Sequence, residues 1–372
     1  MSANPRPLYV TQPSLPPLEE FIPHLRAIWD RRMLTNAGPC HQELEAKLAA
    51  YFGVEHVSLF ANATVALVMA MQAMKLRGEV ITTPFSFVAT SHTLVAAGLE
   101  PVFVDVEPGT LNLDPRRIEA AITPRTSAIL PVHCYGRSCD VEAIEAIARR
   151  HDLKVLYDAA HAFGVHCHCG SVLQHGDMSV LSFHATKVFN SAEGGAVISR
   201  TAELKERLDR LRNFGIVDET TITDVGGNGK MSELHAALGL VQLGHVDGYI
   251  ARRGAVDAIY RERLADVSGL RCIPVHGDAR PNFAYFPVLV EPAFALTRDQ
   301  LYDRLKAQGI FSRRYFFPLI SQLPMYRDRA SASAENLPVA TEAAQRILCL
   351  PIHADMTDAD AHRVVDAIRA LR

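Results

Sequence analysis

Short apolar segments alternate with longer amphipathic segments between residues 57 and 214 of the 372-residue chain. The apolar runs have the length of buried strands, and the segments between them repeat apolar residues at helical spacing. This alternation predicts a mostly parallel sheet with helices on both faces. The expected strands are Val57–Phe60, Val80–Thr83, Pro101–Val106, Ala128–Val132, Lys154–Tyr157, Ser179–Phe183 and Ala196–Ser199. The expected helices are Thr64–Lys75, Ser86–Ala97, Pro115–Ala121, Asp140–His151 and Leu204–Phe214.

The pattern changes after about residue 250, where strand and helix no longer alternate regularly. We expect a helix at Gly248–Leu264, a strand-like segment at Phe283–Val290, and helices at Arg298–Gln308 and Asp358–Leu371. The sequence therefore predicts an α/β protein with two parts. Residues 1–248 would form an N-terminal arm and a large, mostly parallel-sheet domain, and residues 249–372 a smaller α+β domain.

Charge and composition narrow the class of protein. The chain has 38 Lys and Arg against 41 Asp and Glu, for a net charge of −3, which argues against a partner bound by bulk charge, such as nucleic acid. No apolar run is long enough to span a membrane, and the N-terminus lacks a secretory signal. The seven scattered cysteines indicate free thiols in a reducing compartment. We expect a cytoplasmic protein.

One cluster of potential metal ligands, His166–Cys169, stands out. Neighbouring side chains of an extended segment point to alternate faces, so at most two of the four would reach one ion. Zinc sites usually need a second ligand pair, and Cys134 and Cys139 do not have the spacing for one. We therefore expect no functional metal.

Candidate chemistry follows the predicted strands, as expected for an open parallel sheet. Thr64 opens a helix whose N-terminus suits a phosphate, Phe87 offers a flat ring, Asp158 ends an apolar strand, and Lys187 follows the sixth strand. Taken singly, these residues have ordinary explanations as a helix cap, a core aromatic, an ion-pair partner and a surface lysine. Together they match pyridoxal 5′-phosphate, which requires a lysine for its aldehyde and an acid for its ring nitrogen.

These motifs resemble the DegT/DnrJ/EryC1/StrS family of sugar aminotransferases. The resemblance covers nearly the whole chain and implies a fold type I aminotransferase that uses pyridoxal phosphate. It rests on the segments Gly53–Val54, Pro101–Val106, Pro131–Gly136, Asp158–Gly164, Ser182–Lys187, Glu193–Gly195, Ala236–Leu243 and Leu350–His353.

The resemblance also implies roles for single residues. Lys187 would bind the cofactor's aldehyde, Asp158 would keep the pyridine nitrogen protonated, and His161 would meet the phenolic oxygen, where many relatives have Gln. Phe87 would stack on the ring. The phosphate would be bound by Ala63, Thr64 and Ser182 and, from the neighbouring subunit of a homodimer with shared sites, by Asn228. Ala63 departs from the common Gly, and the Gly227–Lys230 segment departs from a pattern with Tyr and Arg.

Two further segments narrow the expected substrate. Val10–Glu19 and Thr83–His92 are similar to family members that act on dTDP-4-keto-6-deoxyglucose. The resemblance implies transfer of an amino group from glutamate to C4, giving a 4-amino-4,6-dideoxy sugar nucleotide for O-antigen or glycoside biosynthesis. A 3-ketosugar aminotransferase and a catalytically silent, sugar-nucleotide-binding relative remain as alternatives.

Overall fold

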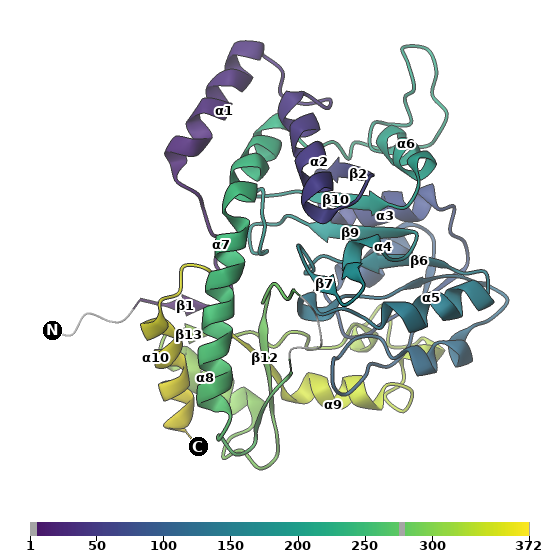
Figure 1. Ribbon diagram of the computed structural model, residues 1–372. Helices are drawn as coiled ribbons and strands as arrows, with labels where there is room; N and C mark the ends of the chain where they lie inside the picture. Colours follow the sequence, from purple (N-terminus) through teal and green to yellow (C-terminus); the bar gives the residue numbers. More distant parts are fainter. Residues whose placement is uncertain (1–5, 275–279, 372) are drawn as a thin grey trace.

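The computed structural model describes residues 6–274 and 280–371 (Figure 1). Residues 1–5 lie outside the described part of the chain. They belong to the N-terminal segment in which the sequence predicts no secretory signal. Within the described residues, no helix is both long and apolar enough to cross a membrane.

Seven strands form the central sheet, in the order β2-β10-β9-β6-β5-β3-β4 (Figure 1). All neighbours pair in parallel except β10, which is antiparallel to both β2 and β9. The predicted mostly parallel sheet is therefore confirmed, and every predicted strand is present with slightly shifted ends. The strands are β2 Val57–Phe60, β3 Glu79–Thr82, β4 Glu100–Phe103, β5 Thr126–Leu130, β6 Lys154–Asp158, β9 Met178–Ser182 and β10 Gly195–Ser199.

Helices cover both faces of this sheet because successive strand side chains point to opposite sides. Val80, Leu156 and Val180 pack on one face against α3 (Ala63–Ala73), α4 (Ala89–Ala96) and α6 (Ala202–Leu211). The other face packs against α5 (Val141–Arg150), α2 (Pro39–Phe52) and the first part of α7 (Glu233–Leu264). One predicted helix is wrong: Pro115–Ala121 forms two short 3-10 turns, Pro115–Arg117 and Glu119–Ala121.

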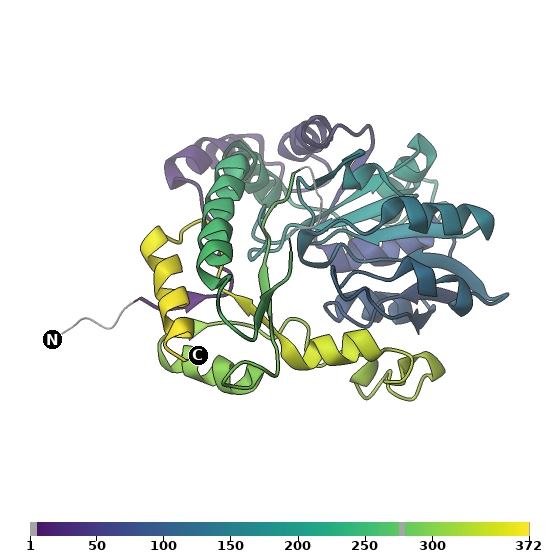
Figure 2. The ribbon, with the colours of Figure 1, turned by 60° about the horizontal axis from the view of Figure 1, so that its bottom comes forward.

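A smaller antiparallel sheet lies at the side of the molecule where the chain ends (Figures 1 and 2). Its strand order is β11-β12-β14, and its core includes residues of α7, α8 and α10. A two-stranded parallel sheet, β1-β13, joins the N-terminal arm to this part. The elements are β1 Leu8–Tyr9, α1 Leu18–Arg31, β11 Leu270–Cys272, β12 Phe286–Val290, α8 Arg298–Ala307, β13 Ile310–Phe311, α9 Pro338–Arg346, β14 Ile347–Leu350 and α10 Asp358–Arg369.

Two helices link the two parts of the chain. The helix expected from Gly248 begins at Glu233, so α7 has 32 residues and runs through the proposed boundary at residue 248. In Figure 2, α9 lies on the lower side of the part that holds the large sheet. The Asp105 carboxylate, which follows β4, accepts hydrogen bonds of 2.9 and 2.8 Å from the backbone N–H groups of Val339 and Ala340 in α9. The C-terminal part is therefore fixed to the large sheet by these hydrogen bonds as well as by the long helix.

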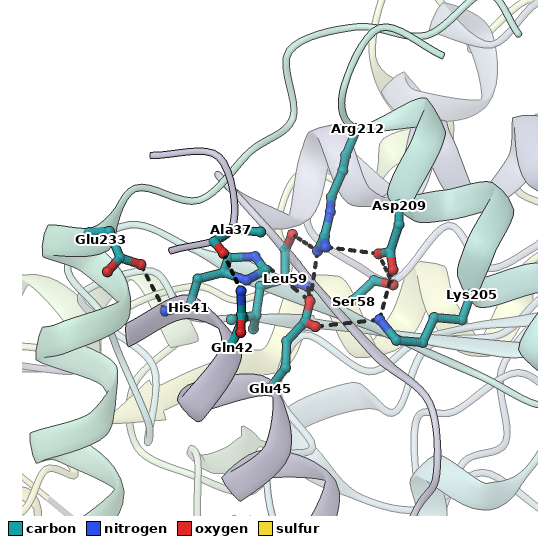
Figure 3. A network of polar contacts seen from close by, with 10 residues as sticks. All are labelled: Ala37, His41, Gln42, Glu45, Ser58, Leu59, Lys205, Asp209, Arg212 and Glu233. Atoms are coloured by element: carbon teal, nitrogen blue, oxygen red, sulfur yellow. Dashed lines mark hydrogen bonds and ion pairs between the residues drawn. The ribbon is translucent and has the colours of Figure 1, made fainter. Parts of the chain in front are cut away.

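A network of charged residues connects α2, β2 and α6 (Figure 3). The Glu45 carboxylate accepts hydrogen bonds from the Leu59 backbone at 3.0 Å and from the Arg212 guanidinium at 2.8 Å, and Arg212 also pairs with Asp209 at 2.9 Å. The Arg212 backbone carbonyl in turn accepts a hydrogen bond from Gly229 N–H at 2.9 Å. The network thus fixes the base of the loop that carries Asn228.

Candidate active site

The candidate residues collect where strands of the large sheet end. Asp158 is the last residue of β6 and Ser182 the last of β9, and these two strands are parallel neighbours. Lys187 lies in the connection from β9 to β10. The structure brings Lys187, Asp158 and His161 close enough for their charges to influence one another. These three side chains therefore lie at or just after the ends of β6 and β9, which is where the sequence analysis expects candidate chemistry in an open parallel sheet.

The Asp158 carboxylate is buried and held by two donors. Thr90 donates its hydroxyl hydrogen to Oδ2 at 2.7 Å, and the Ala160 backbone N–H donates to Oδ1 at 3.1 Å. Burial raises the pKa of Asp158, and these hydrogen bonds and the positive charge of Lys187 oppose that rise. A cationic N–H group placed against this carboxylate would be stabilised by a charge-assisted hydrogen bond.

Lys187 is arranged as a nucleophilic amine. Removal from water lowers its pKa from 10.5 to about 8, because burial disfavours the charged ammonium, while the Asp158 carboxylate opposes the change. About a tenth of the side chain is therefore the free amine at pH 7, far more than for an exposed lysine. A free amine is the form that attacks an aldehyde and accepts a proton.

His161 has an unfilled hydrogen-bonding position. Its Nδ1 is buried without a hydrogen-bond partner among the described residues. The ring lies parallel to Phe316 at 6.2 Å between centroids and edge-on to Tyr285 at 5.0 Å. Burial and the charge of Lys187 lower its pKa well below 6.5, so the imidazole is neutral at pH 7. A buried polar atom of this kind is suited to a ligand's oxygen.

The start of α3 is the part of the candidate site that suits a phosphate. Asn62 caps this helix by accepting the Val65 backbone N–H at 2.9 Å, while the first turn keeps further N–H groups directed outward. Gly195 is paired with Ser182 and lies so close to Ala63 that a Cβ there would be 2.8 Å from the Ala63 nitrogen. Ala63 and Ser182 are thus brought to the same corner, where Thr64 is exposed. Helix N-termini of this type bind anions.

The two remaining predicted contacts are exposed. Phe87 shows 60% of its surface, so a face of its ring is free to cover a flat ligand. Asn228 is exposed in the loop beyond α6 and forms a backbone bridge with Asn213, outside the buried group of Asp158, His161 and Lys187. Its proposed contact with a neighbouring subunit therefore stays a prediction.

Several residues at the site were not singled out from the sequence. Thr90 holds Asp158, and Tyr285 lines a small cavity together with His161 and Lys187. Asn282 donates to the backbone carbonyl of His161 at 2.7 Å. Thr90 could have been found as one of several hydroxyl residues in an otherwise apolar segment. Asn282 and Tyr285 lie more than 90 residues beyond Lys187 in the sequence, and no local pattern connects them with the site.

The residues present fit pyridoxal phosphate by their chemistry. An amine, a buried carboxylate, an unpartnered imidazole nitrogen and a helix N-terminus correspond to the aldehyde, the ring nitrogen, the phenolic oxygen and the phosphate. The methyl group of Ala63 does not remove its backbone N–H, which is the group that would bind the phosphate.

Comparison with known proteins agrees with this assignment. Residues 18–369 match the DegT/DnrJ/EryC1/StrS aminotransferase family. The chain is 54% identical to a dTDP-4-amino-4,6-dideoxy-D-glucose transaminase of Shigella dysenteriae, over 99% of this chain and all of the relative. It is 52% identical to an enzyme of the same name from Escherichia coli, over 95% and 96% of the two chains.

A solved structure gives the same result for the fold. The crystal structure of DesI in the presence of its TDP-sugar product has a TM-score of 0.94 and 38% sequence identity, covering 98% of this chain and 93% of DesI. The chain therefore belongs to the DegT/DnrJ/EryC1/StrS aminotransferase family and is a sugar aminotransferase that depends on pyridoxal phosphate.

Proposed function

We propose that this enzyme transfers the amino group of glutamate to C4 of dTDP-4-keto-6-deoxyglucose. The observation that carries the proposal is the 54% identity, over 99% of the chain, with a dTDP-4-amino-4,6-dideoxy-D-glucose transaminase. The buried group of Lys187, Asp158 and His161 supports it. The product would be a dTDP-linked 4-amino-4,6-dideoxyglucose. Such a sugar nucleotide would serve O-antigen or glycoside biosynthesis.

Lys187, Asp158 and His161 would each have a different role in the reaction. When bound, pyridoxal phosphate supplies an aromatic ring that accepts electrons from the carbon next to nitrogen. Lys187 Nζ, as the free amine, would accept the proton from Cα of glutamate in the first half of the reaction, and its ammonium form would deliver a proton to C4 of the sugar in the second half. Asp158 keeps a proton on the ring nitrogen through electrostatic stabilisation, and His161, being neutral, offers one N–H hydrogen bond to the phenolic oxygen.

A second copy of the chain would complete the site. The loop beyond α6 exposes a group of large apolar side chains that a partner subunit would cover: Phe214, Ile216, Val217, Ile222 and Val225. Asn228 lies in the same loop and is also exposed. We place it against the phosphate of the partner's cofactor. Mixed dimers of Lys187→Ala and Asn228→Ala chains test this. In such a dimer one of the two shared sites combines the intact Lys187 of one chain with the intact Asn228 of the other. Activity should therefore be higher than in either variant alone.

The compartment follows from thiol chemistry. All seven cysteines are free in the structure, and free thiols are typical of a reducing compartment. We therefore place the enzyme in the cytoplasm.

A panel of substrates tests the proposed function. The purified holoenzyme would be incubated with glutamate and matched 3-keto and 4-keto nucleotide sugars, and products would be identified by mass and NMR. The proposal requires the highest kcat/KM on dTDP-4-keto-6-deoxyglucose. Preference for a 3-keto sugar would overturn the regiochemistry, and the absence of any glutamate-dependent change in the cofactor's absorbance would indicate a catalytically silent protein.

A further inference from the structure

Only the first half of the segment His166–Cys169 is an extended strand, and its second half forms a turn. β7 (His166–Cys167) and β8 (Gly170–Ser171) form a short antiparallel hairpin. Gly170 has a φ of 115°, a backbone angle that favours glycine and that closes the tight turn. The turn lets the thiols of Cys167 and Cys169 approach the same point, in agreement with the expectation that at most two of the four side chains reach one ion. A metal site therefore needs a ligand from outside the segment.

A third ligand comes from His175, which follows a 3-10 turn at Val172–Gln174. His175 Nε2 lies 3.8 Å from Cys167 Sγ and 3.3 Å from Cys169 Sγ, and all three ligand atoms lie within 4.8 Å of one another. Zinc binds sulfur at about 2.3 Å and imidazole nitrogen at about 2.0 Å, so tetrahedral S and N ligands are about 3.5 Å apart. The two observed distances lie on either side of that value.

The other nitrogen of His175 is held by a carboxylate. Nδ1 lies 3.4 Å from Glu145 Oε1 on α5, and the same oxygen accepts the Gly176 backbone N–H at 2.8 Å. A metal-bound histidine typically donates its second N–H to a carboxylate, which fixes the tautomer and directs the first nitrogen at the ion. Glu145 is suited to this role because its own position is fixed by the backbone.

The fourth position faces solvent. Cys169 is exposed, and its thiol also lies within 4.8 Å of ligand atoms of His168 and Glu142. One of these side chains, or a water molecule, would complete a tetrahedral set.

We propose that Cys167, Cys169 and His175 form a zinc site, with Glu145 as the carboxylate that orients His175. The ion would connect the β7–β8 hairpin to His175 after the 3-10 turn and, through Glu145, to α5. Its role would be structural, because the cluster shares no residue with the Lys187 group.

Metal analysis of the intact holoenzyme tests this site. The protein would be purified without a metal-affinity tag, dialysed against a metal-scavenging resin, and measured by mass spectrometry of elements. We expect about one zinc ion per chain. Cys167→Ser, Cys169→Ser and His175→Gln should each lose most of it, whereas the matched control Cys272→Ser, a cysteine outside the cluster, should keep it. Equal zinc content in all five proteins would overturn the proposal.

Cobalt substitution of the wild-type chain keeps the test independent of how well the variants fold. Bound Co²⁺ should give thiolate-to-cobalt charge-transfer absorption and the intense visible bands of tetrahedral coordination. Wild-type protein that binds neither zinc nor cobalt, or that has only five titratable thiols of seven because Cys167 and Cys169 are joined by a disulfide, would contradict a metal site. Zinc content does not depend on turnover, so this result is separate from that of the proposed function.

Discussion

Thr90 donates a hydrogen bond of 2.7 Å to Asp158, joining the first turn of α4 to the end of β6. The Thr90 hydroxyl is also 2.8 Å from that of Ser86. Because Asp158 is buried, its orientation depends on these few donors. Thr90 is therefore a positioning residue for the carboxylate that meets the cofactor's ring nitrogen.

Thr90→Val keeps the shape of the side chain and removes the donor. We expect kcat to fall about 10-fold with little change in KM for the sugar, since one hydrogen bond to a charged group contributes about 1.5 kcal/mol. Steady-state kinetics measures this. Thr93→Val, on the same helix and bonded only to backbone carbonyls, is the matched control. An equal loss in both variants would mean that α4 is simply perturbed.

Asp158→Asn removes the negative charge and keeps the size. We expect the variant to retain the cofactor and to lose at least 10²-fold in kcat, because electrostatic stabilisation at the reacting centre is lost. Turnover and the cofactor's absorbance spectrum measure the two effects separately. Activity within a factor of about 3 of wild type would rule out the assigned role.

The pKa of Lys187 sets the pH dependence of cofactor capture. The lowered value of about 8 means that about half of Lys187 is the reactive free amine at pH 8, and nearly all of it above about pH 9. Rapid mixing of cofactor-free protein with pyridoxal phosphate should give a rate that rises about 10-fold per pH unit up to 8 and then levels off. A rate that keeps rising to pH 10, as for an exposed lysine, would show that burial does not lower this pKa.

The charged network around Glu45 predicts a large stability effect. Arg212 is buried, and Arg212→Ala would leave Glu45 with a weaker partner, Lys205 at 3.4 Å. We expect the free energy of unfolding to fall by about 3 kcal/mol, as for other broken buried pairs. Lys47→Ala, which breaks an exposed pair with Glu43, should cost at most about 0.5 kcal/mol. Denaturant titration compares the two, and similar small losses would refute the importance of the network.

The parts of the fold that follow from local pattern were predictable. Apolar runs such as Val57–Phe60 and Ser179–Phe183 identified the sheet, and the residues that follow them identified Asp158 and Lys187. The first half of α7 was missed because its glycines lower helix propensity. Tertiary packing explains one of them, since a Cβ at Gly239 would lie 2.7 Å from Leu44 Cδ2 on α2.

Contacts between distant segments could not be predicted from a single sequence. β1 has only two residues and is stabilised by pairing with β13, about 300 residues later. The hairpin at Cys167 depends on the positive φ of Gly170, and a single glycine in a sequence does not by itself fix where a turn lies. The same long-range dependence applies to Asn282, whose contact with the His161 carbonyl depends on the packing of the small part against the large sheet.

The transfer of ¹⁵N from labelled glutamate tests the central claim most directly. Wild-type holoenzyme and Lys187→Ala would be incubated with [¹⁵N]glutamate and dTDP-4-keto-6-deoxyglucose, and the product examined by proton–nitrogen correlation NMR. The account predicts ¹⁵N bonded to C4 of the sugar with the wild type, and a loss of at least 10³-fold in rate with the variant. Nitrogen at C3, or transfer by Lys187→Ala at the wild-type rate, would contradict it.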